Sequence, residues 1–221
     1  MPKKPARKSD TPVSTARRDQ SKLNYRKSEE TEARIFEATV DCLCAEGLRG
    51  VTLQKVADRA GVTRSGVQYY AASTTALLHA VQAYIVDKVW GDDLRRTRDL
   101  PHGPDRFAQA LDHAIALPRS KYFIAWNELL TAARTDNALH DVVMNGARLR
   151  EDIHDALFEE IHGDVQPNAV ARLRSMDDLV VMALHAAAIV RFADDDGERI
   201  DHALALLKEL TLDMFRKGAA V

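Results

Sequence analysis

The sequence predicts an all-α protein, and three observations support that fold class. Aromatic residues make up only 6% of the chain, and Ala and Leu supply most of its apolar bulk, which favours packed helices over sheets. Seven prolines and ten glycines in 221 residues are too few for a turn-rich β fold. Apolar residues recur at helical spacing, and no run alternates with the period of two that a half-buried strand requires.

The first expected helix spans residues 29–46 and ends at Gly47, because glycine tolerates the left-handed conformation of a helix C-cap. The side chains on its broad core-facing stripe are Ile35, Phe36, Thr39, Val40, Leu43 and Cys44. Gly50 extends the break. Thr52 then caps a short helix, since its hydroxyl can accept a hydrogen bond from a free N–H of the first turn.

Gly61 interrupts the chain again, and Thr63 or a neighbour caps a second short helix that runs to about Tyr70. Ser73 caps a longer helix, which we expect to end at Gly91. Its apolar residues at helical spacing are Leu77, Leu78, Val81, Ile85 and Val89. Residues 92–103 hold Gly, Pro and six charged residues, so we expect a loop or linker there.

Five further helical blocks follow, separated by clusters of Pro, Gly, Asn and Asp. They span residues 104–117, 119–134, 137–162, 167–192 and 197–217. The longest nearly uncharged apolar stretch, residues 179–190, is too short to span a bilayer and predicts a buried helix.

The first 27 residues are strongly basic, with nine Lys or Arg against Asp10 and Asp19, whereas the rest of the chain is net negative. They lack the apolar segment of a secretory signal and show no helical periodicity. We therefore expect residues 1–27 to be a disordered basic arm, which either contacts an anionic partner or is a solubilising tail.

The only two cysteines, Cys42 and Cys44, lie two positions apart. On a helix they point to different sides and cannot form a disulfide with each other. Their spacing matches neither a redox motif nor a zinc site, so we expect small apolar residues of a cytoplasmic protein.

Residues 52–70 have the pattern of a helix-turn-helix, with the turn at Gly61 and small Ala57 where the two helices cross. The residues that can pack the two helices together are Val56, Val62 and Val67. The second helix then presents side chains that can bind base edges or phosphates: Thr63, Arg64, Ser65, Gln68 and Tyr69. An ordinary helical hairpin with a glycine turn would show the same pattern.

In order and spacing, residues 29–78 resemble the TetR/AcrR family of transcriptional regulators. The residues that carry the resemblance are Ile35, Ala38, Gly47, Thr52, Val56, Ala57, Ala60-Gly61-Val62-Thr63, Val67-Gln68-Tyr69-Tyr70, Ser73 and Ala76-Leu77-Leu78. It implies a helix-turn-helix DNA-binding domain over residues 28–76 and a helical effector-binding and dimerisation domain over residues 77–221.

The resemblance also implies that residues 63–70 enter the major groove of double-stranded DNA. The residues expected to contact the DNA are Thr52, Lys55, Thr63, Arg64, Ser65, Gln68, Tyr69, Tyr70 and Thr74. Three positions depart from the family pattern. Gln68 stands where Tyr is commonest, and Thr74 stands where Lys contacts phosphate. Ala71 replaces a core Phe, which removes about 1.5–3 kcal/mol of burial unless Phe36 or another side chain fills the space.

The middle blocks contain apolar residues beside a few polar ones, which fits a cavity for a small, mostly apolar effector. The expected effector contacts are Phe107, Leu111, His113, Phe123, Trp126, Asn127, Leu130 and Met144. A packed core with polar surface positions would give a similar composition.

The last two blocks carry apolar stripes that predict a homodimer. The expected interface residues are Leu179, Ala183, Ala187, Leu204, Leu207 and Leu210. Burial of these stripes inside one subunit is the alternative. A dimer suits a DNA-binding protein, because two recognition helices double the sequence that is read.

The expected function is that of a repressor that leaves a pseudo-palindromic operator when its effector binds. We expect no catalytic residues, no cofactor and no membrane partner. A helical protein-interaction module without DNA binding is one alternative. A metal-binding enzyme is a weaker one, suggested by Glu151-x-x-His154 and Glu159-x-x-His162. On one helix these two motifs lie about 12 Å apart, too far to share a metal.

Overall fold

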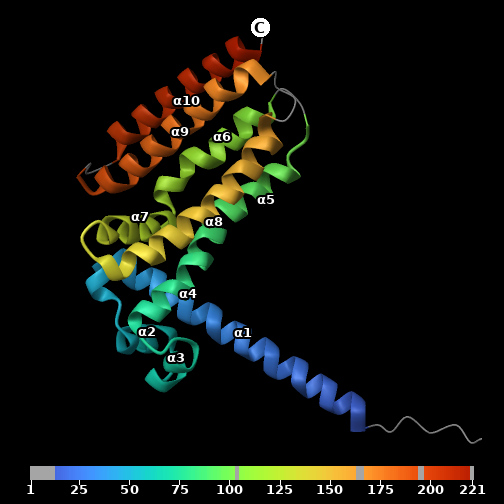
Figure 1. Ribbon diagram of the computed structural model, residues 1–221, viewed down its shortest axis with the longest axis vertical. Helices are drawn as coiled ribbons and strands as arrows, with labels where there is room; N and C mark the ends of the chain where they lie inside the picture. The colour runs from blue at the N-terminus through green and yellow to red at the C-terminus, as the bar shows by residue number, and fades with distance from the viewer. Residues whose placement is uncertain (1–12, 103–104, 163–166, 194–196, 220–221) are drawn as a thin grey trace, which may run out of the picture.

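The computed structural model describes residues 13–102, 105–162, 167–193 and 197–219, and every regular element in these ranges is a helix (Figure 1). The predicted all-α fold is therefore confirmed. None of the described helices combines the length and the apolar character needed to cross a membrane.

The chain begins with α1 (Val13–Glu46), the short 3-10 helix η1 (Leu48–Gly50), α2 (Leu53–Ala60), α3 (Arg64–Tyr70) and α4 (Thr74–Val86). The caps are those expected from the sequence. The hydroxyl oxygens of Thr52, Thr63 and Ser73 accept hydrogen bonds from backbone N–H groups three residues later, at 3.0–3.2 Å. Such caps typically contribute about 1 kcal/mol each. Gly47 and Gly61 adopt positive φ angles of 64° and 65°, as their helix-ending role requires.

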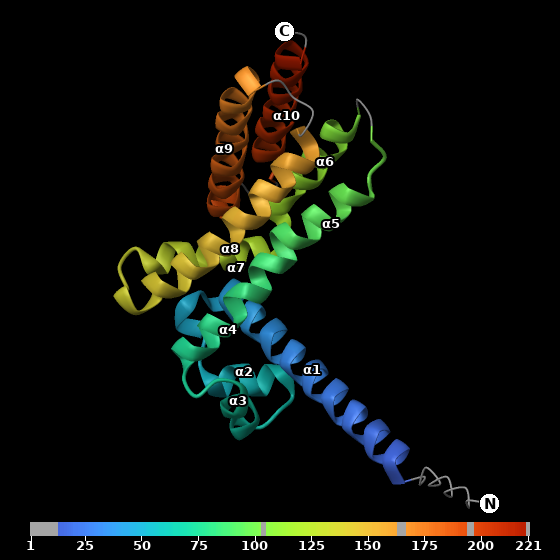
Figure 2. The same ribbon diagram turned by 45° about the vertical axis from the view of Figure 1, so that its right-hand side comes forward.

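The expectation of a disordered arm over residues 1–27 is wrong for residues 13–27, whose backbone is helical and continuous with the rest of α1. Residues 1–12 lie outside the described residues. No Pro or Gly occurs between positions 13 and 46. A helix already packed on the core can therefore propagate upstream without a second nucleation cost. Figures 1 and 2 show the N-terminal half of α1 projecting away from the rest of the molecule.

The expected stop at Gly91 and the expected loop over residues 92–103 are also corrected. α4 continues through a π-helical turn, η2 (Asp87–Gly91), directly into α5 (Asp92–Asp99). Gly91 is helical, with φ −66°. Arg95 pairs with Asp87 at 2.9 Å and with Asp92 at 2.6 Å, so these three charged residues share a solvated helix face.

The remaining helices fall within a few residues of the blocks expected from periodicity. They are α6 (Arg106–Ala116), η3 (Leu117–Arg119), α7 (Lys121–Ala133), α8 (Asn137–His162), α9 (Pro167–Val190), η4 (Arg191–Ala193) and α10 (Glu198–Ala219). α9 and α10 pack side by side at the end of the molecule farthest from α3 (Figures 1 and 2).

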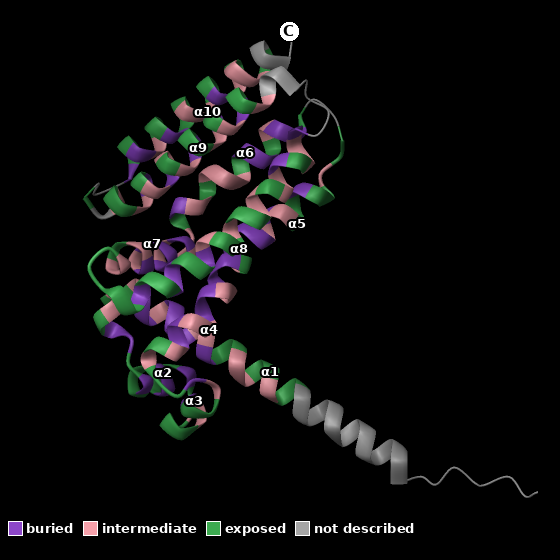
Figure 3. Cartoon of the chain, viewed as in Figure 1, coloured by how far each residue is buried: buried purple, intermediate pink, exposed green. Residues whose placement is uncertain are grey.

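One continuous buried cluster runs from Ile35 on α1 to Leu204 on α10. Figure 3 shows the buried positions concentrated along α4, α7 and α8, in the middle of the molecule. A Cβ on Gly146 of α8 would lie 2.4 Å from Gln82 Oε1 and 2.7 Å from the Trp126 ring. Glycine at this position therefore lets α8 approach α4 and α7 closely. The expected domain boundary at residues 76 and 77 falls inside α4, which packs against both parts.

The two cysteines are free in the structure. Cys42 is buried, and the half-buried thiol of Cys44 donates to the carbonyl of Lys121 at 3.1 Å. Burial raises the pKa of Cys44 to about 11, so this thiol stays protonated near neutral pH.

Candidate nucleic-acid interface and effector cavity

α2 and α3 cross in a compact helix-turn-helix. Val56, Ala57 and Val67 are fully buried where the two helices meet, and Val62 is half-buried beside them. These are the residues that the sequence pattern assigned to the helix crossing. Their burial and the two threonine caps fix the orientation of α3 relative to α2.

The outer surface of this unit carries most of the expected DNA-contacting residues. Seven of the nine are exposed: Thr52, Lys55, Thr63, Arg64, Ser65, Gln68 and Tyr69. Tyr69 is 83% exposed. Thr52 and Thr63 use a hydroxyl lone pair to cap a helix, so each O–H proton is still available to a phosphate. The surface thus offers hydroxyl, amide, phenol and guanidinium groups side by side.

The other two expected residues, Tyr70 and Thr74, lie at the edge of this surface and are half-buried. The Tyr70 hydroxyl donates to the Ser28 carbonyl at 3.1 Å and lies 3.1 Å from Ser28 Oγ. Tyr70 therefore anchors α3 to α1. Lys55 pairs with Glu46, which partly neutralises its charge.

Two exposed arginines beside α2 are not among the residues expected from the sequence to contact DNA: Arg49 on η1 and Arg59 in the last turn of α2. Their position in the sequence, as basic residues at helix ends close to the helix-turn-helix, was the signal that could have drawn attention to them. Ala71 is buried, and Phe36 packs against Tyr84 with ring centroids 5.5 Å apart. Phe36 is thus committed to a contact between α1 and α4.

A polar cluster joins α1, α4 and α7 where the helix-turn-helix meets the rest of the chain. The Glu37 carboxylate accepts hydrogen bonds from Tyr84 and from Tyr122, the latter at 2.7 Å, and pairs with Lys121 at 2.6 Å. Burial alone would raise the pKa of Glu37, but the hydrogen bonds from Lys121 and the two tyrosines hold it below its ordinary value. Lys121 also reaches Asp41 at 2.9 Å.

A cavity of about 70 Å³ lies between η2, α5, α6, η3, α7, α8 and α9. Its lining residues are Trp90, Asp93, Phe107, Ala110, Leu111, Ala114, Leu117, Phe123, His154, Leu157, Phe158, Ile161, Asp177, Val180, Val181 and Leu184. Of the eight expected effector contacts, Phe107, Leu111 and Phe123 line this cavity.

The other five expected contacts lie outside the lining: His113, Trp126, Asn127, Leu130 and Met144. Trp126 packs edge-on against Trp90 at 5.6 Å, and Met144 is exposed. Asn127 contacts the cavity-lining residue Phe123 without lining the cavity itself. Its side-chain amide donates to the Phe123 carbonyl at 2.8 Å, and its oxygen lies 2.9 Å from Nδ1 of His185, whose ring stacks on Phe123. Burial lowers the pKa of His185 to about 4, so this histidine is neutral.

Three titratable groups interrupt the apolar lining, one each from α5, α8 and α9: Asp93, His154 and Asp177. Asp93 is 5% exposed, and its Oδ1 has no hydrogen-bond partner. Burial raises the pKa of Asp93 to about 6, and nearby Arg96 offsets only part of that effect. Burial also lowers the pKa of His154. Asp177 lies 3.5 Å from Nε2 of the buried His162.

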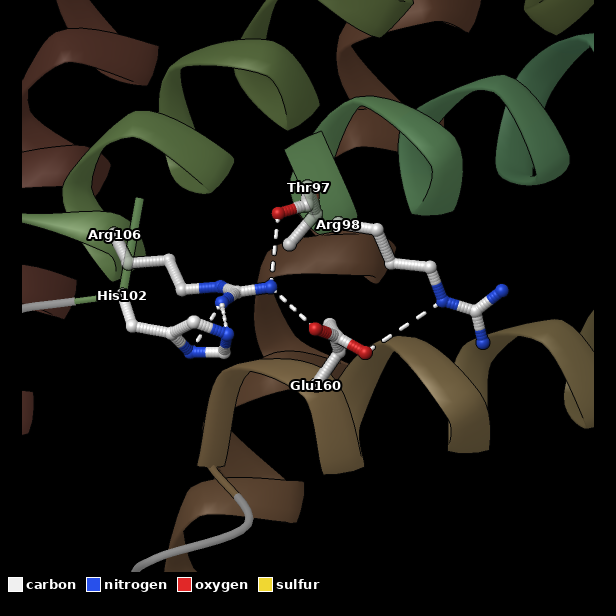
Figure 4. Close-up of polar contacts among 5 residues, drawn as sticks. All are labelled: Thr97, Arg98, His102, Arg106 and Glu160. Carbon is white, nitrogen blue, oxygen red and sulfur yellow. Dashed lines mark hydrogen bonds and ion pairs between the residues drawn. The ribbon is translucent and has the colours of Figure 1, made fainter. Parts of the chain in front are cut away.

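A buried arginine joins three helices beside the cavity (Figure 4). The Arg106 guanidinium lies between His102 and Glu160 of α8. It donates to the Thr97 carbonyl at 3.0 Å, lies 2.6 Å from Nδ1 of His102, and pairs with Glu160. Arg98 approaches the same carboxylate from the other side at 3.5 Å. The cluster fixes α5, α6 and α8 relative to one another next to Phe107.

The α9–α10 pair exposes an apolar face. Its large exposed side chains are Leu179, Met182, Ile189, Val190, Leu206 and Leu210. Ala183 and Leu207 are half-buried. Ala187 and Leu204, two expected interface residues, are buried inside the subunit and therefore unavailable to a second copy. Each of the two helices carries apolar residues on an outer and an inner side, and the predicted stripe mixes positions from both.

Among the described residues, no group of three or more His, Cys, Asp or Glu is arranged to hold a metal ion. His154 of the first Glu-x-x-His motif faces the apolar cavity, and His162 of the second packs between the rings of Phe107 and Phe158.

Comparison with known proteins gives a consistent result. Residues 35–81 match a family described as bacterial regulatory proteins, tetR family. The HTH-type transcriptional regulator SrpR of Pseudomonas putida is 29% identical over 135 residues, which cover 59% of this chain and 61% of SrpR. The match thus spans less than two thirds of that relative.

Two solved structures have the same fold over most of the chain. A TetR transcription regulator from Haloarcula marismortui is 20% identical, with TM-score 0.62, over 84% of this chain and 98% of its own. The regulator FadR from Bacillus subtilis, solved in complex with stearoyl-CoA, is 14% identical, with TM-score 0.61, over 81% of this chain and 97% of its own.

The buried carboxylate in the cavity yields a stability prediction. Asp93→Asn should stabilise the protein near pH 7.5 by up to about 3 kcal/mol, because the folded chain no longer holds a desolvated charge. The pKa of Asp93 is raised on folding, so the cost to the wild type is present above that pKa. It disappears as the pH falls through about 6 towards the usual value of an aspartate.

Urea denaturation of both proteins near pH 7.5 and near pH 4.5 measures this difference. Asp178→Asn, at an exposed position on α9, is the control and should change little at either pH. A variant that is less stable than wild type near pH 7.5 would show that Asp93 is held by a favourable partner.

Proposed function

The chain belongs to the TetR family, and on that premise we propose that it is a DNA-binding transcriptional regulator controlled by a small molecule. The observation that carries this proposal is the exposed surface of the helix-turn-helix. Arg64, Ser65, Gln68 and Tyr69 all face solvent on α3, which two caps and a buried helix crossing hold in place.

We propose that α3 enters the major groove of double-stranded DNA. Arg64 and Gln68 are the candidates for base contacts, because guanidinium and amide groups can pair with two acceptor or donor atoms of one base edge. Thr52, Thr63, Ser65 and Tyr69 carry hydroxyls that suit phosphate contacts, which set the register of the protein on the duplex. Lys55, Tyr70 and Thr74 would complete the interface at its edge, where Tyr70 acts through α1.

The same proposal assigns the cavity to an effector that releases the protein from a pseudo-palindromic operator. A cavity of about 70 Å³ is well below the roughly 300–1,000 Å³ of typical ligand sites, so an effector must widen it. The walls that would move include Trp90 on η2, which continues directly from α4. α4 begins at the Ser73 cap three residues after α3 ends, so a displaced wall would pull on the DNA-reading unit. FadR, a neighbour in fold, was solved with stearoyl-CoA, whose stearoyl chain is apolar, and this supports an effector with an apolar part here.

We further propose that two copies associate through the exposed apolar face of α9 and α10. A face of this kind that recurs along two adjacent helices is self-complementary in a two-fold dimer. It also lies at the end of the molecule opposite α3, so both recognition helices remain free to reach one duplex (Figure 1).

The DNA-reading surface is tested by alanine substitution in the full-length protein. Arg64→Ala or Gln68→Ala should each cost about 1–3 kcal/mol of operator affinity and relax base preference at one position, if that side chain reads a base. Tyr69→Ala should weaken specific and non-specific DNA alike, because a phosphate contact carries no sequence information. Mobility-shift titrations on fragments selected from genomic DNA provide the measurement.

Arg172→Ala removes an exposed arginine on α9 and is the matched control, with no expected effect on DNA affinity. Unchanged binding in all three α3 variants would reject this surface. Failure of the wild type to retain any genomic fragment would favour a protein-interaction module.

The dimer is tested by placing a charge on the exposed stripe. Leu179→Arg or Leu210→Arg should convert a dimer into a folded monomer, because each copy would bury an unpaired cation at the interface. Sedimentation velocity at micromolar concentration distinguishes the two species. Asp141→Arg adds a charge at an exposed position of α8, outside the stripe, and should leave the dimer intact. A monomeric wild type at this concentration would refute the interface.

The basic N-terminal segment is tested by the salt dependence of DNA binding. We propose that residues 1–27 follow phosphates or the minor groove beside the operator, with residues 13–27 doing so as part of α1. Each neutralised phosphate contributes about 0.9 to the slope of log affinity against log salt. If two or three cations per subunit engage, a dimer that lacks residues 1–27 should lose roughly 4–5 units of slope. An equal slope for the truncated and full-length proteins would show that the segment does not contact DNA.

A further inference from the structure

The cavity contains a buried acidic group that has no counter-ion. Among the described residues, Asp93 takes part in no ion pair, and its Oδ1 has no hydrogen-bond partner although the side chain is 95% buried. An ionised carboxylate in such a position is costly unless a partner arrives. Asp177 brings a second carboxylate to the same lining from α9.

We propose that the effector is a compact cationic amphiphile, whose ammonium group pairs with Asp93 while its hydrocarbon part fills the apolar cavity. The inference rests on the proposed function of the cavity and narrows the class of its ligand. The ammonium group would supply the missing donor to Oδ1, and Asp177 on α9 would add favourable charge in the same cavity.

Within the described part of the chain, no cation already occupies this role. Arg96 is near enough to influence Asp93, but its side chain is exposed on α5. His154 faces the cavity from α8. Burial lowers the pKa of His154 below its ordinary value although Asp177 opposes the shift, so this ring is a poor counter-ion for the carboxylates near neutral pH. Arg150 and Arg174 lie over the rings of Trp90 and Phe158, at 6.0 and 4.3 Å from the ring centroids, and neither of them lines this cavity.

The same arrangement argues against the other ligand classes. An anionic ligand would place a third negative charge beside two carboxylates in an apolar surrounding, which is strongly unfavourable. A neutral alcohol could donate one hydrogen bond to Asp93 but would not neutralise its charge. A metal ion needs several ligands, and the described residues offer no cluster of three.

The hydrocarbon part of the ligand would meet aromatic and branched side chains. Phe107, Leu111 and Phe123 line the cavity from α6 and α7, and Phe158, Val180 and Leu184 line it from α8 and α9. Because the cavity is about 70 Å³, a single ring or short chain is the natural starting size. Larger amines would require more widening and would therefore couple more strongly to α4.

The experiment compares three probes of matched shape, benzylamine, benzyl alcohol and benzoate, on the full-length protein near neutral pH. Titration calorimetry and ligand-observed NMR give the dissociation constants. We expect benzylamine to bind about 10- to 100-fold more tightly than benzyl alcohol, and benzoate not to bind. Asp93→Asn should reduce benzylamine affinity to that of the alcohol and leave alcohol affinity unchanged.

Asp178→Asn removes an exposed carboxylate from α9, outside this cavity, and should preserve the preference for the amine. Thermal melts of each variant show whether it is folded. Equal or tighter binding of the alcohol or the benzoate overturns the inference, as does an amine preference that survives Asp93→Asn. So does a wild type that binds none of the three probes.

A mobility-shift assay on the operator separates this inference from the proposed function. Operator release by benzyl alcohol, with no preference for the amine, would reject the cationic ligand and leave the regulator standing. Suppose instead that the protein prefers benzylamine, that this preference requires Asp93, and that the protein binds no DNA. This result would support the cationic ligand class and reject the proposed function.

Discussion

The carboxylate of Glu37 accepts two tyrosine hydroxyls and one lysine ammonium, so a single side chain on α1 fastens α4 and α7 to each other. Without it, three half-buried polar groups would face one another with no common acceptor, at the point where the helix-turn-helix meets the helical body. Lys121 and Tyr122 immediately precede Phe123, whose ring lines the cavity. The same few residues therefore belong to the junction and to the wall of the proposed effector site.

This junction is reinforced by continuity of the backbone and of the core. α4, η2 and α5 form one uninterrupted helical path from the Ser73 cap to the Arg106–Glu160 cluster, and buried side chains run without a gap from α1 to α10. If this helical path adopts a second arrangement, its helices move together, because close-packed interiors do not deform gradually. Under the proposed function, a local change at the cavity would therefore reach α3 as a rigid displacement of this helical path.

Features that depend on local chemistry could be predicted from the sequence, and features that depend on tertiary context could not. The caps at Thr52, Thr63 and Ser73 and the glycine turns act within a few residues, and the structure has them as expected. The run at 92–103 was misjudged because a charged helix face resembles a linker, and that error concealed Asp93. The cavity lining was predicted only in part, since periodicity identifies an apolar side but not the neighbour it faces. The same ambiguity placed Ala187 and Leu204 on an external surface although both are internal.

The π-helical turn at Asp87–Gly91 sets the direction in which α5 presents its side chains. Such a turn holds one residue more than a regular helical turn, and each residue of an α-helix advances the side-chain direction by about 100°. The wide turn absorbs the extra residue, so α5 keeps the rotation about its axis that places Asp93 in the cavity wall. If the same residues formed regular α-helical turns, α5 would rotate by about a quarter turn, and Asp93 would leave the wall. The orientation of this carboxylate thus depends on the hydrogen-bond register of one helical turn as well as on residue identity.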